Sequence, residues 1–403
     1  MFFNIILGTT IFLVVLQLFI FTKSLLFYKI LSPYWYRPKY KDLDEFPTVH
    51  LFVASKGLSN DSEKIMHKFA NQNYPGTYKV TFITESAQDP GTPLLQNLAK
   101  EYEHVFHLVA GRTSKCSQKN HNLLAGMKED QVSDVFAFAD ADVLVGENWL
   151  TQLISPLSMG RNWVSTGLPS HTLSNTSLPH LIHAAMTAYQ AKLEMSVNAI
   201  WGGSYAIWRE TFDRLGTRKY WGCSVVDDVS LFQLIEKNNL RHWWSSKKIK
   251  VLPLPELDLE VFTSHSSIKK NINWFIRQVL YIKFNRRVIW YLAVSANAVC
   301  LLIMLAAPFC LFFPKDPMLF RVGMIGISFL VFIQALNLCL TLIRGRMECT
   351  LFQWSKLCII GDITASIALI STLFIDRLVW SGITYEVGRD GKVTKVIHPE
   401  EMV

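Results

Sequence analysis

The residues with the clearest chemical meaning are Asp140 and Asp142, which follow the apolar run 134–139. In an extended segment, residues two apart point to the same side, so both carboxylates can face one ligand. Two such carboxylates can hold a divalent cation, which neutralises a diphosphate. The other interpretation is a solvated acidic loop. The triplet ends a predicted strand, where open α/β sheets bind ligands, and both interpretations stay open at this point.

A second acidic pair, Asp227-Asp228, follows Val225 and Val226 and opens a predicted helix. One of these acids can cap the helix, because carboxylates are favoured at helix N-termini. The other is then available as a general base. The segment 201–204, Trp-Gly-Gly-Ser, has paired glycines, which permit either close backbone approach to a ligand or a tight turn.

Other residue types exclude several classes of enzyme. His180 and His183 lie three apart on a predicted helix and fit surface or packing roles better than metal ligation, and His50 lies inside a predicted strand. The chain has no GxSxG, P-loop or HExxH motif, so serine hydrolase, P-loop and zinc protease functions have no support. Its 7 cysteines include no CxxC pair, which fits a reducing compartment rather than a disulfide framework or structural zinc site.

The elements that must position these residues alternate along the chain. Apolar, β-rich runs predict strands, and amphipathic segments between and after them predict helices. This alternation predicts an α/β fold with a mostly parallel sheet covered on both faces. The predicted strands are 48–54, 79–84, 104–110 and 134–139, and the predicted helices are 61–71, 93–102, 119–127, 149–157 and 178–195.

The chain has 403 residues, of which 50% are hydrophobic and 18% charged. Its composition differs between long apolar stretches and segments with the charge content of a globular domain. Residues 1–22, 290–314 and 322–343 carry no charge, and 357–375 carries only Asp362. Each stretch has about the 20 residues that cross a hydrocarbon core. The first lacks the charged start and small-residue cleavage site of a signal peptide, so we interpret it as an anchor. A disordered chain and a wholly soluble enzyme are excluded.

The net charge of +8 is concentrated beside these stretches. Residues 23–41 hold five Lys or Arg, residues 261–287 hold six, and residues 344–356 hold three against one acid. This pattern favours contact with anionic lipid headgroups and not with nucleic acid. Basic residues after the anchor predict that the globular part is cytosolic. The amphipathic segment 261–287 either lies in the membrane interface or packs on the domain as an ordinary basic helix.

Taken in order, these features resemble the family 2 type membrane glycosyltransferases, and most of all the ceramide glucosyltransferases, from about residue 10 to the C-terminus. The matching motifs are Lys56-Gly57, the acidic segment FITESAQDP with Glu85 and Asp89, Lys119-x-x-Asn122-Leu123, Asp140 with Asp142, Gly167-Leu168-Pro169, Gly202-Gly203-Ser204, Asp227-Asp228, and the tail residues Trp380, Gly382 and Tyr385. The usual Gln/Arg-x-x-Arg-Trp motif aligns with 277–281, where Leu280 and Tyr281 replace Arg and Trp. Ser86 stands where the family usually has an aspartate.

The resemblance implies a role for each matching residue. Asp228 is implied as the catalytic base, and Asp140 and Asp142 as ligands of Mg²⁺ or Mn²⁺. Residues implied in binding the donor are Lys56, Glu85, Lys119, Asp140, Gly203, Asp227, Arg277 and Lys283. The implied fold is a Rossmann-like GT-A domain with one N-terminal and about three C-terminal transmembrane helices.

The predicted reaction is an inverting transfer of a sugar, glucose by the resemblance, from a UDP-sugar to the hydroxyl of a membrane lipid such as ceramide. One base and a single displacement give inversion without a covalent intermediate. The alternatives are a polyprenyl-phosphate glycosyltransferase or processive polysaccharide synthase, and a non-catalytic scaffold with a degenerate fold. The predicted location is a bacterial inner membrane or a eukaryotic Golgi or ER membrane, and the oligomeric state stays open.

The predicted organisation is an anchor over 1–31, a catalytic domain over 47–260, an interface segment over 261–288, a transmembrane region over 289–376 and a tail over 377–403. Three C-terminal spans place the tail across the membrane from the catalytic domain. If Trp380 and Tyr385 contribute to the active site, one apolar stretch must instead be re-entrant. We expect this to be the stretch with Asp362, because an ionisable group in the membrane is costly without a partner.

Overall fold

A computed structural model describes residues 2–26, 46–59, 61–128, 130, 132–169, 177–197, 199–254, 257–261, 267–344 and 351–401. The chain forms two compact units. We call the first the helical unit; it consists of Met1–Leu31, Thr172–Val197 and His265–Ile375. We call the second the sheet unit; it consists of Ser32–His171, Asn198–Ser264 and Asp376–Val403. Each unit is described by itself.

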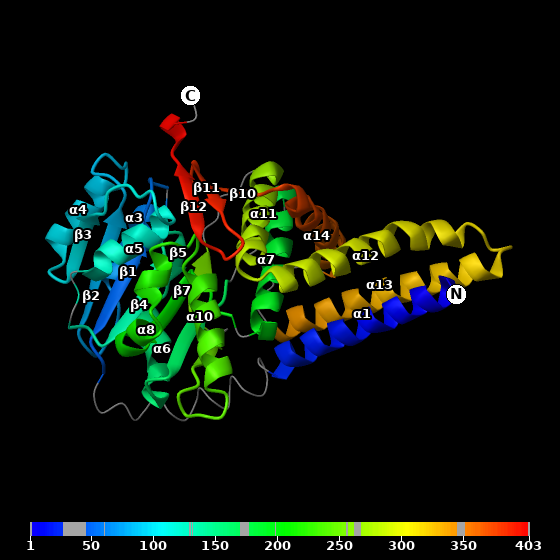
Figure 1. The fold of residues 1–403 in the computed structure, drawn as a ribbon, viewed down its shortest axis with the longest axis horizontal. Coiled ribbons are helices and arrows are strands. Elements are labelled where there is room, and N and C mark those ends of the chain that lie inside the picture. Colours follow the sequence, from blue (N-terminus) through cyan, green and yellow to red (C-terminus); the bar gives the residue numbers. More distant parts are fainter. Residues whose placement is uncertain are drawn as a thin grey trace. The chain divides into compact units, whose positions relative to one another are not determined.

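The sheet unit is built on a 7-stranded sheet of order β3-β2-β1-β4-β7-β6-β8, flanked by helices (Figure 1). Strands β1, β2, β3 and β4 are mutually parallel, β7 is antiparallel to β4 and β6, and β6 is parallel to β8. The strands are β1 (Val49–Ala54), β2 (Tyr78–Thr84), β3 (Val105–Val109), β4 (Val135–Asp140), β6 (Trp163–Gly167), β7 (Ser204–Trp208) and β8 (Lys250–Leu254).

Two small sheets and a set of helices complete this unit. The two-stranded sheet pairs β5 (Val143–Val145) with β9 (Leu259–Val261), and the three-stranded sheet has the order β10 (Arg377–Trp380), β11 (Ile383–Val387), β12 (Val393–Ile397). The helices are α3 (Ser62–Ala70), α4 (Thr92–Glu101), α5 (Gln118–Lys128), α6 (Trp149–Ile154), α8 (Arg209–Arg214), α9 (Thr217–Trp221), α10 (Asp228–Arg241) and the 3-10 turns η2 (Ser155–Met159) and η4 (Pro399–Glu401).

Burial explains why the central strands are nearly continuous apolar runs. Strands covered on both faces by helices have no solvent-facing side, so they lose the alternation of apolar and polar residues. Phe52, Phe136, Phe138, Tyr205 and Trp221 belong to one buried cluster on this sheet. Tyr205 stacks on Phe138 with ring centroids 4.6 Å apart. The aromatic cluster therefore fixes β4 against β7, the two strands whose ends carry the acidic and glycine motifs.

Strand pairing brings those ends together. Ala54 at the end of β1 is paired with Asp140 at the end of β4, and Ala139 is paired with Ser204 at the start of β7. The Asp140 N–H also donates to the Gly203 carbonyl at 3.3 Å. The loops after β1 and β4 and the loop before β7 therefore meet at one edge of the sheet, where ligands bind in folds of this class.

The helical unit consists of α1 (Phe2–Leu25), α7 (Leu178–Val197), α11 (Ile268–Asn285), α12 (Arg287–Leu311), α13 (Pro317–Arg344), α14 (Leu351–Ser371) and the 3-10 turn η3 (Thr372–Phe374). Among the described residues, two helices are long and apolar enough to cross a membrane, over Arg287–Leu311 and Pro317–Asn337. Leu7–Lys23 and Ile359–Phe374 are apolar but shorter. Two of the four expected spans are therefore found by length and composition.

The observed elements agree closely with the predicted ones up to residue 157. Each of the four predicted strands is present, with ends shifted by at most one residue. Strands β6, β7 and β8 were not predicted, and two of their pairings are antiparallel, so the sheet is mostly but not wholly parallel. The units also divide the chain differently from the predicted domains. Residues 172–197 belong to the helical unit and residues 376–403 to the sheet unit.

Candidate active site

The sheet edge is dominated by one lysine among acidic residues. Lys119, in the first turn of α5, places its Nζ 2.7 Å from Asp140 Oδ1 and 3.0 Å from Asp227 Oδ1. Its side chain is 12% exposed and that of Asp227 is 2% exposed. Two motifs that are 87 positions apart in sequence, Asp140 and Asp227, are therefore joined by one ammonium group.

The acids determine the protonation of this lysine. Burial on its own lowers the pKa of a lysine, because it penalises the charged form. The carboxylates of Asp140, Asp227 and Asp228 outweigh burial and hold the pKa of Lys119 above its usual value. Lys119 is therefore a fixed positive charge at the sheet edge.

Asp228 begins helix α10 and has a different environment from Asp227. Its Oδ2 accepts the Gly202 N–H at 2.7 Å and its Oδ1 accepts the Val229 N–H at 2.6 Å. Burial, followed by the neighbouring charge of Asp227, raises the pKa of Asp228 to about 7, against the lowering effect of Lys119 and the two N–H donors. A carboxylate with this pKa accepts a proton far more readily near neutral pH than an ordinary aspartate does.

Asp227 is the N-cap residue of α10, but it makes no side-chain cap hydrogen bond. Its carboxylate contacts Lys119 and accepts a hydrogen bond from the Tyr205 hydroxyl at 3.3 Å. The capping interpretation of this acid is therefore wrong, and both acids of the pair point into the site.

The glycine pair before β7 is explained by the space around Asp228. A Cβ on Gly202 would lie 2.8 Å from Asp228 Oδ2 and 3.4 Å from Lys119 Nζ, and a Cβ on Gly203 would overlap the Trp201 ring. Only a residue without a Cβ lets the backbone N–H approach the carboxylate this closely. Both interpretations of this pair are observed: the Ser204 N–H donates to the Trp201 carbonyl at 3.2 Å across a tight turn, and the close backbone approach is to a side chain of the chain itself.

The carboxylates at this edge of the sheet also fit a divalent cation. Asp140 ends β4, and Asp142 is exposed in the turn that follows. Within the described residues, no group of three or more His, Cys, Asp and Glu is placed to hold a metal ion. Mg²⁺ is commonly held by one or two carboxylates together with substrate phosphates, and carboxylate oxygens outnumber the ammonium group here. The residues therefore fit a cation whose shell a diphosphate completes.

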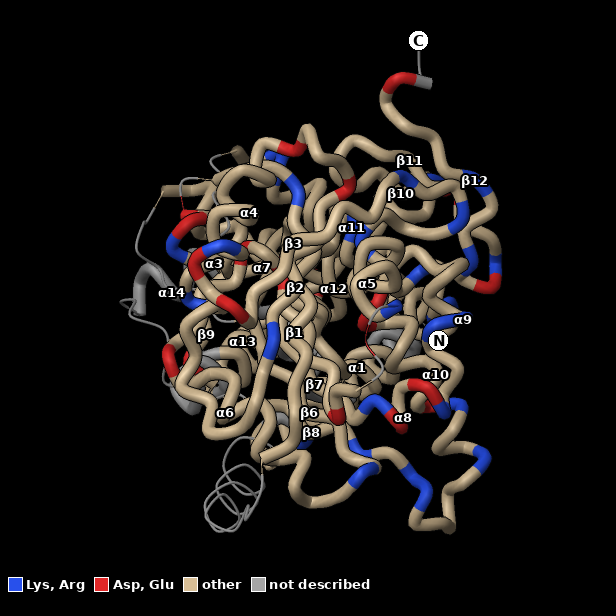
Figure 2. The backbone as a smooth tube through the Cα atoms, turned by 90° about the vertical axis from the view of Figure 1, so that its left-hand side faces the viewer, with Lys and Arg blue, Asp and Glu red and all other residues tan. Residues whose placement is uncertain are grey.

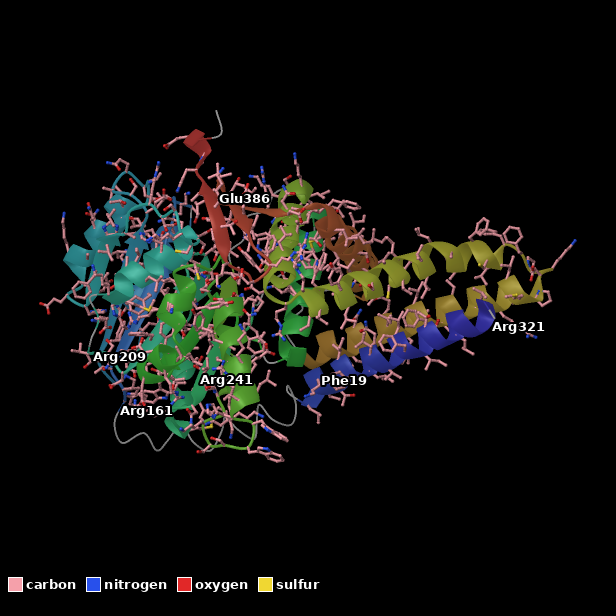
Figure 3. The ribbon with its side chains drawn as sticks, viewed as in Figure 1. Phe19, Arg161, Arg209, Arg241, Arg321 and Glu386 are labelled. Atoms are coloured by element: carbon pink, nitrogen blue, oxygen red, sulfur yellow. The ribbon has the colours of Figure 1, made fainter. Side chains whose placement is uncertain are left out.

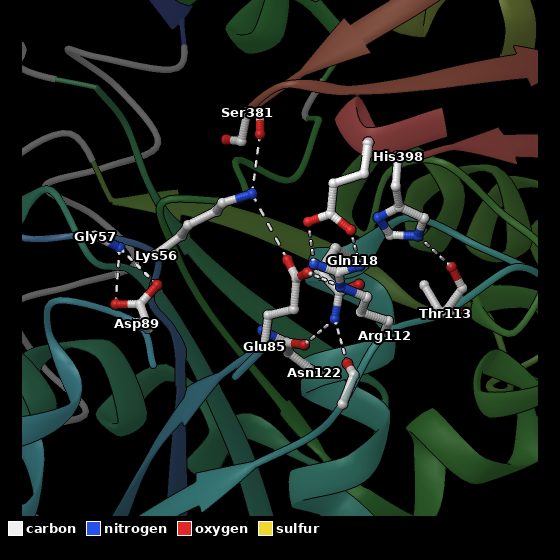
Figure 4. Close-up of polar contacts among 12 residues, drawn as sticks. Lys56, Gly57, Glu85, Asp89, Arg112, Thr113, Gln118, Asn122, Ser381 and His398 are labelled. Atoms are coloured by element: carbon white, nitrogen blue, oxygen red, sulfur yellow. Dashed lines mark hydrogen bonds and ion pairs between the residues drawn. The ribbon is translucent and has the colours of Figure 1, made fainter. Parts of the chain in front are cut away.

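Basic and acidic side chains from the loops after β1, β2 and β3 form a second cluster beside this edge (Figure 4). Glu85, just after β2, lies 3.6 Å from Lys56 Nζ and 3.3 Å from Arg112 Nε. Asp89, the other acid of this segment, accepts the N–H groups of Gly57 and Gly91. Asp89 therefore holds the loops after β1 and β2 together, while Glu85 faces the basic side chains.

The C-terminal tail contacts the same loops. Lys56 Nζ donates to the Ser381 carbonyl at 2.9 Å, and Arg112 forms a two-pronged ion pair with Glu400 at 2.8 Å for each bond. The Gln118 N–H, at the start of α5, donates to the buried Tyr385 hydroxyl at 3.2 Å. Sequence reasoning included Tyr385 through the tail motif. It missed Arg112 and Glu400, for which no motif gives a signal.

Arg277 and Lys283 lie on α11 in the helical unit. Lys283 is buried there, and its Nζ donates to the carbonyls of Thr372 and Ile375, each at 2.8 Å. Their part in donor binding stays a prediction. The histidines are elsewhere: His50 bonds Asp130 and Thr81 inside the sheet unit, and His183 is buried against Trp274 in the helical unit.

A mostly parallel sheet whose carboxyl edge carries a DxD triplet and an acidic pair is a GT-A-like α/β fold. The family model described as glycosyl transferase family 21 matches residues 11–393. The chain therefore belongs to this family, the ceramide glucosyltransferase-like branch of the family 2 type enzymes, and is a glycosyltransferase. The predicted resemblance is confirmed.

Solved structures include similar chains at low identity. The mannosyltransferase PcManGT from Pyrobaculum calidifontis, in complex with GDP-Man and Mn²⁺, is 14% identical over 92% of this chain and 99% of that chain, with a TM-score of 0.48. GalNAc-T7 with UDP, GalNAc and Mn²⁺ is 13% identical over 63% of this chain, with a TM-score of 0.41, and the match spans 51% of that chain. No curated protein sequence matches.

Proposed function

We propose that the protein transfers a sugar, glucose, from a UDP-sugar to the hydroxyl of a membrane lipid such as ceramide, with inversion at the anomeric carbon. The observation that carries this proposal is the environment of Asp228. Its carboxylate, with a pKa raised to about 7, lies beside Lys119 and Asp227 at the carboxyl edge of the sheet. This edge is where substrates bind in open α/β folds.

Asp228 acts as the general base. As the lipid oxygen attacks the anomeric carbon, its proton passes to an Asp228 carboxylate oxygen, and the bond from that carbon to the diphosphate oxygen breaks on the opposite face. The N–H groups of Gly202 and Val229 hold the carboxylate in place before the reaction. A base that is positioned in advance costs no reorganisation when the proton moves.

The leaving diphosphate needs positive charge. Lys119 supplies one fixed charge at the sheet edge, and Arg277 and Lys283 are proposed to add charge from the helical unit. Mg²⁺ or Mn²⁺, held by Asp140 and Asp142 and by the phosphates, would neutralise the charge that develops on the leaving oxygen. Lys56 and Glu85 are proposed to bind the nucleotide.

The order of the units along the chain supports a catalytic domain and a tail on one side of a bilayer, which we propose is the cytosolic side. Strands β9 and β10 both belong to the sheet unit, although α11 to α14 lie between them in sequence. A chain that leaves one side of a membrane and returns to that side crosses it an even number of times. Helices α12 and α13 can supply this pair of crossings, with α1 as a further anchor.

Helix α14 is then re-entrant or interfacial. Its apolar part is short, and Gln334 Nε2 of α13 donates to Asp362 Oδ2 at 2.6 Å. A partner of this kind lowers the cost of a carboxyl group within a membrane.

A single transfer to a lipid fits the helical unit better than processive synthesis does. Leu280 and Tyr281 stand where the usual motif has Arg and Trp, and their side chains are only 3% and 6% exposed. They offer neither charge nor an open aromatic face to a growing polymer.

The test uses the full chain in lipid nanodiscs with labelled UDP-glucose, Mn²⁺ and ceramide. We expect glucosylceramide from the parent chain and none from Asp228→Asn, which should still bind UDP. Asp213→Asn is the matched control, because Asp213 pairs with Arg218 on α9, outside the site. Full transfer by Asp228→Asn would overturn the base assignment, and a parent chain that turns over only other donors or acceptors would overturn the substrate assignment.

A further inference from the structure

The segment 237–250, from the last residues of α10 to the first residue of β8, exposes large apolar side chains. Leu240, Trp243 and Trp244 are 77%, 60% and 81% exposed. The two tryptophan rings contact each other in a tilted arrangement, with centroids 3.5 Å apart and an interplanar angle of 35°. Single exposed apolar residues are normal on protein surfaces, but a cluster of this kind marks a site of interaction.

The same segment is strongly basic. It contains Lys237, Arg241, Lys247, Lys248 and Lys250 and no acidic residue. Figure 2 shows blue positions along the chain beyond α10, and Figure 3 labels Arg241 at the end of that helix. Within the described residues, Arg241, Lys247 and Lys248 have no acidic partner. The attraction that these charges exert is therefore not neutralised inside the protein.

Hydrogen bonds hold this segment in a defined shape. Asn239 forms two bonds to the backbone of Ile249, both at 2.7 Å, and Asn238 donates to the Lys247 carbonyl at 3.2 Å. Asn162 donates to the Ser246 carbonyl at 2.8 Å. Hydrogen bonds therefore hold the turn on both sides, and the tryptophan side chains project from a fixed backbone.

We infer that segment 237–250 is a bilayer contact of the sheet unit, in which Trp243 and Trp244 lie at the headgroup level and the basic residues face anionic lipid. Tryptophan concentrates at membrane interfaces because its ring is amphipathic. Lys and Arg near the surface are attracted to the negative potential of anionic leaflets. This charge and aromatic content complements a bilayer better than it complements a protein groove.

Helix α10 links the proposed bilayer contact to the proposed catalytic base. Asp228 begins the helix and Arg241 ends it, 14 residues in all. At 1.5 Å per residue, the helix is about 20 Å long. A tryptophan contact at one end therefore limits the distance between the bilayer surface and the proposed base at the other end to about 20 Å.

The experiment labels the full chain with 5-fluorotryptophan in nanodiscs that contain phosphatidylcholine with anionic phosphatidylglycerol. Trp243→Phe and Trp244→Phe assign the two ¹⁹F resonances. A lipid spin-labelled near the headgroup should broaden both resonances, and a water-soluble paramagnetic chelate should affect them less. Val132→Trp is the matched control, because Val132 is 79% exposed on the same unit but lies outside the basic segment. Its resonance should respond only to the soluble agent.

Two further arms make the result decisive. Lys247→Gln/Lys248→Gln should reduce broadening in anionic discs to the level of discs of phosphatidylcholine alone. The inference is overturned if Trp243 and Trp244 behave like Val132→Trp, or if they respond only when RNA is added, which would indicate a nucleic-acid surface. The inference rests on the proposed function only in that the chain resides in a bilayer. No turnover is measured, so failure of the sugar-transfer test and failure of this one are separate results.

Discussion

At the residue scale, the site depends on the balance between Lys119 and the three acids around it. Burial and the charge of Asp227 raise the pKa of Asp228, and Lys119 lowers it. The folded-state pKa of about 7 is above the value of about 3.9 for a free aspartate. The fold therefore favours the protonated acid. A rise of pH through about 7 ionises the proposed base and also destabilises the fold through this group.

Removal of the Lys119 charge should raise the pKa of Asp228. We expect the acid limb of kcat/KM, centred near pH 7 in the parent, to move to higher pH in Lys119→Gln, because the charge that lowers the pKa of Asp228 is gone. On that limb, raising the pKa of the base by one lowers its ionised fraction about tenfold. The measurement is the pH profile of transfer at saturating Mn²⁺. Lys68→Gln, in the same unit, should leave the profile unchanged, and movement to lower pH in Lys119→Gln would contradict the argument.

The glycine before β7 offers a test of geometry alone. In Gly202→Ala the new Cβ would meet Asp228 Oδ2 at 2.8 Å, so the carboxylate must move. A misplacement of about 1 Å at a catalytic group can cost about 100-fold in rate. We expect kcat to fall by that order while UDP binding, measured by calorimetry, changes little.

Gly222→Ala is the control for this substitution. Its φ of −60° suits any residue, and a Cβ there lies at least 3.4 Å from its neighbours. If Gly202→Ala retains the parent kcat, the close approach of the Gly202 backbone has no role in holding the base.

At the element scale, the tail strands act as part of the sheet unit. Tyr385 is fully buried, and burial raises the pKa of its hydroxyl to about 12. That hydroxyl accepts the N–H of Gln118, one residue before Lys119. Val393 N–H donates to the Cys223 carbonyl, close to the acidic pair. The tail is therefore tied to both segments that supply the charged residues of the site.

We expect Tyr385→Phe to leave the Gln118 N–H buried without its acceptor, at a cost of about 1–3 kcal/mol. The loss should appear as a lower Tm in detergent and a higher KM for the UDP-sugar, with a smaller change in kcat. Tyr220→Phe is the control, because its hydroxyl donates to Gln233 on a half-buried surface. An unchanged Tm and KM in Tyr385→Phe would show that the tail does not order the start of α5.

At the scale of the whole molecule, the discontinuous units support the proposed membrane topology. The tail forms hydrogen bonds to other parts of the sheet unit, which favours the re-entrant alternative over three C-terminal crossings. We expect a protease site added after residue 403 and one inserted beside the exposed Val132 of the sheet unit to be cleaved from the same side of sealed vesicles. Cleavage from opposite sides would contradict an even number of crossings. A site in the short turn between α12 and α13 should be cleaved from the other side.

The net charge of a domain does not show where charges gather locally. Summed by sequence, positive charge is greatest beside the apolar stretches, and the remainder of the chain is acidic overall. The sequence itself places five basic residues of that remainder within 237–250, a segment that has no acid, and the structure adds that two tryptophans among them are exposed. An average over the domain conceals a patch because charges act locally, within about a Debye length of 8–10 Å.

The sequence by itself determined the strands up to β4, the two acidic pairs, the glycine pair and the apolar helices, because these follow from local periodicity and residue type. It did not determine that Asp227 contacts Lys119 and Tyr205 instead of capping α10, and it gave no signal for Arg112 and Glu400. Those depend on contacts across long separations, such as the 267 positions between Gln118 and Tyr385. Only the tertiary structure joined Asp140 to Asp227 through Lys119 and returned the tail to the sheet, because strand pairing and packing, not spacing along the chain, decide which loops share an edge.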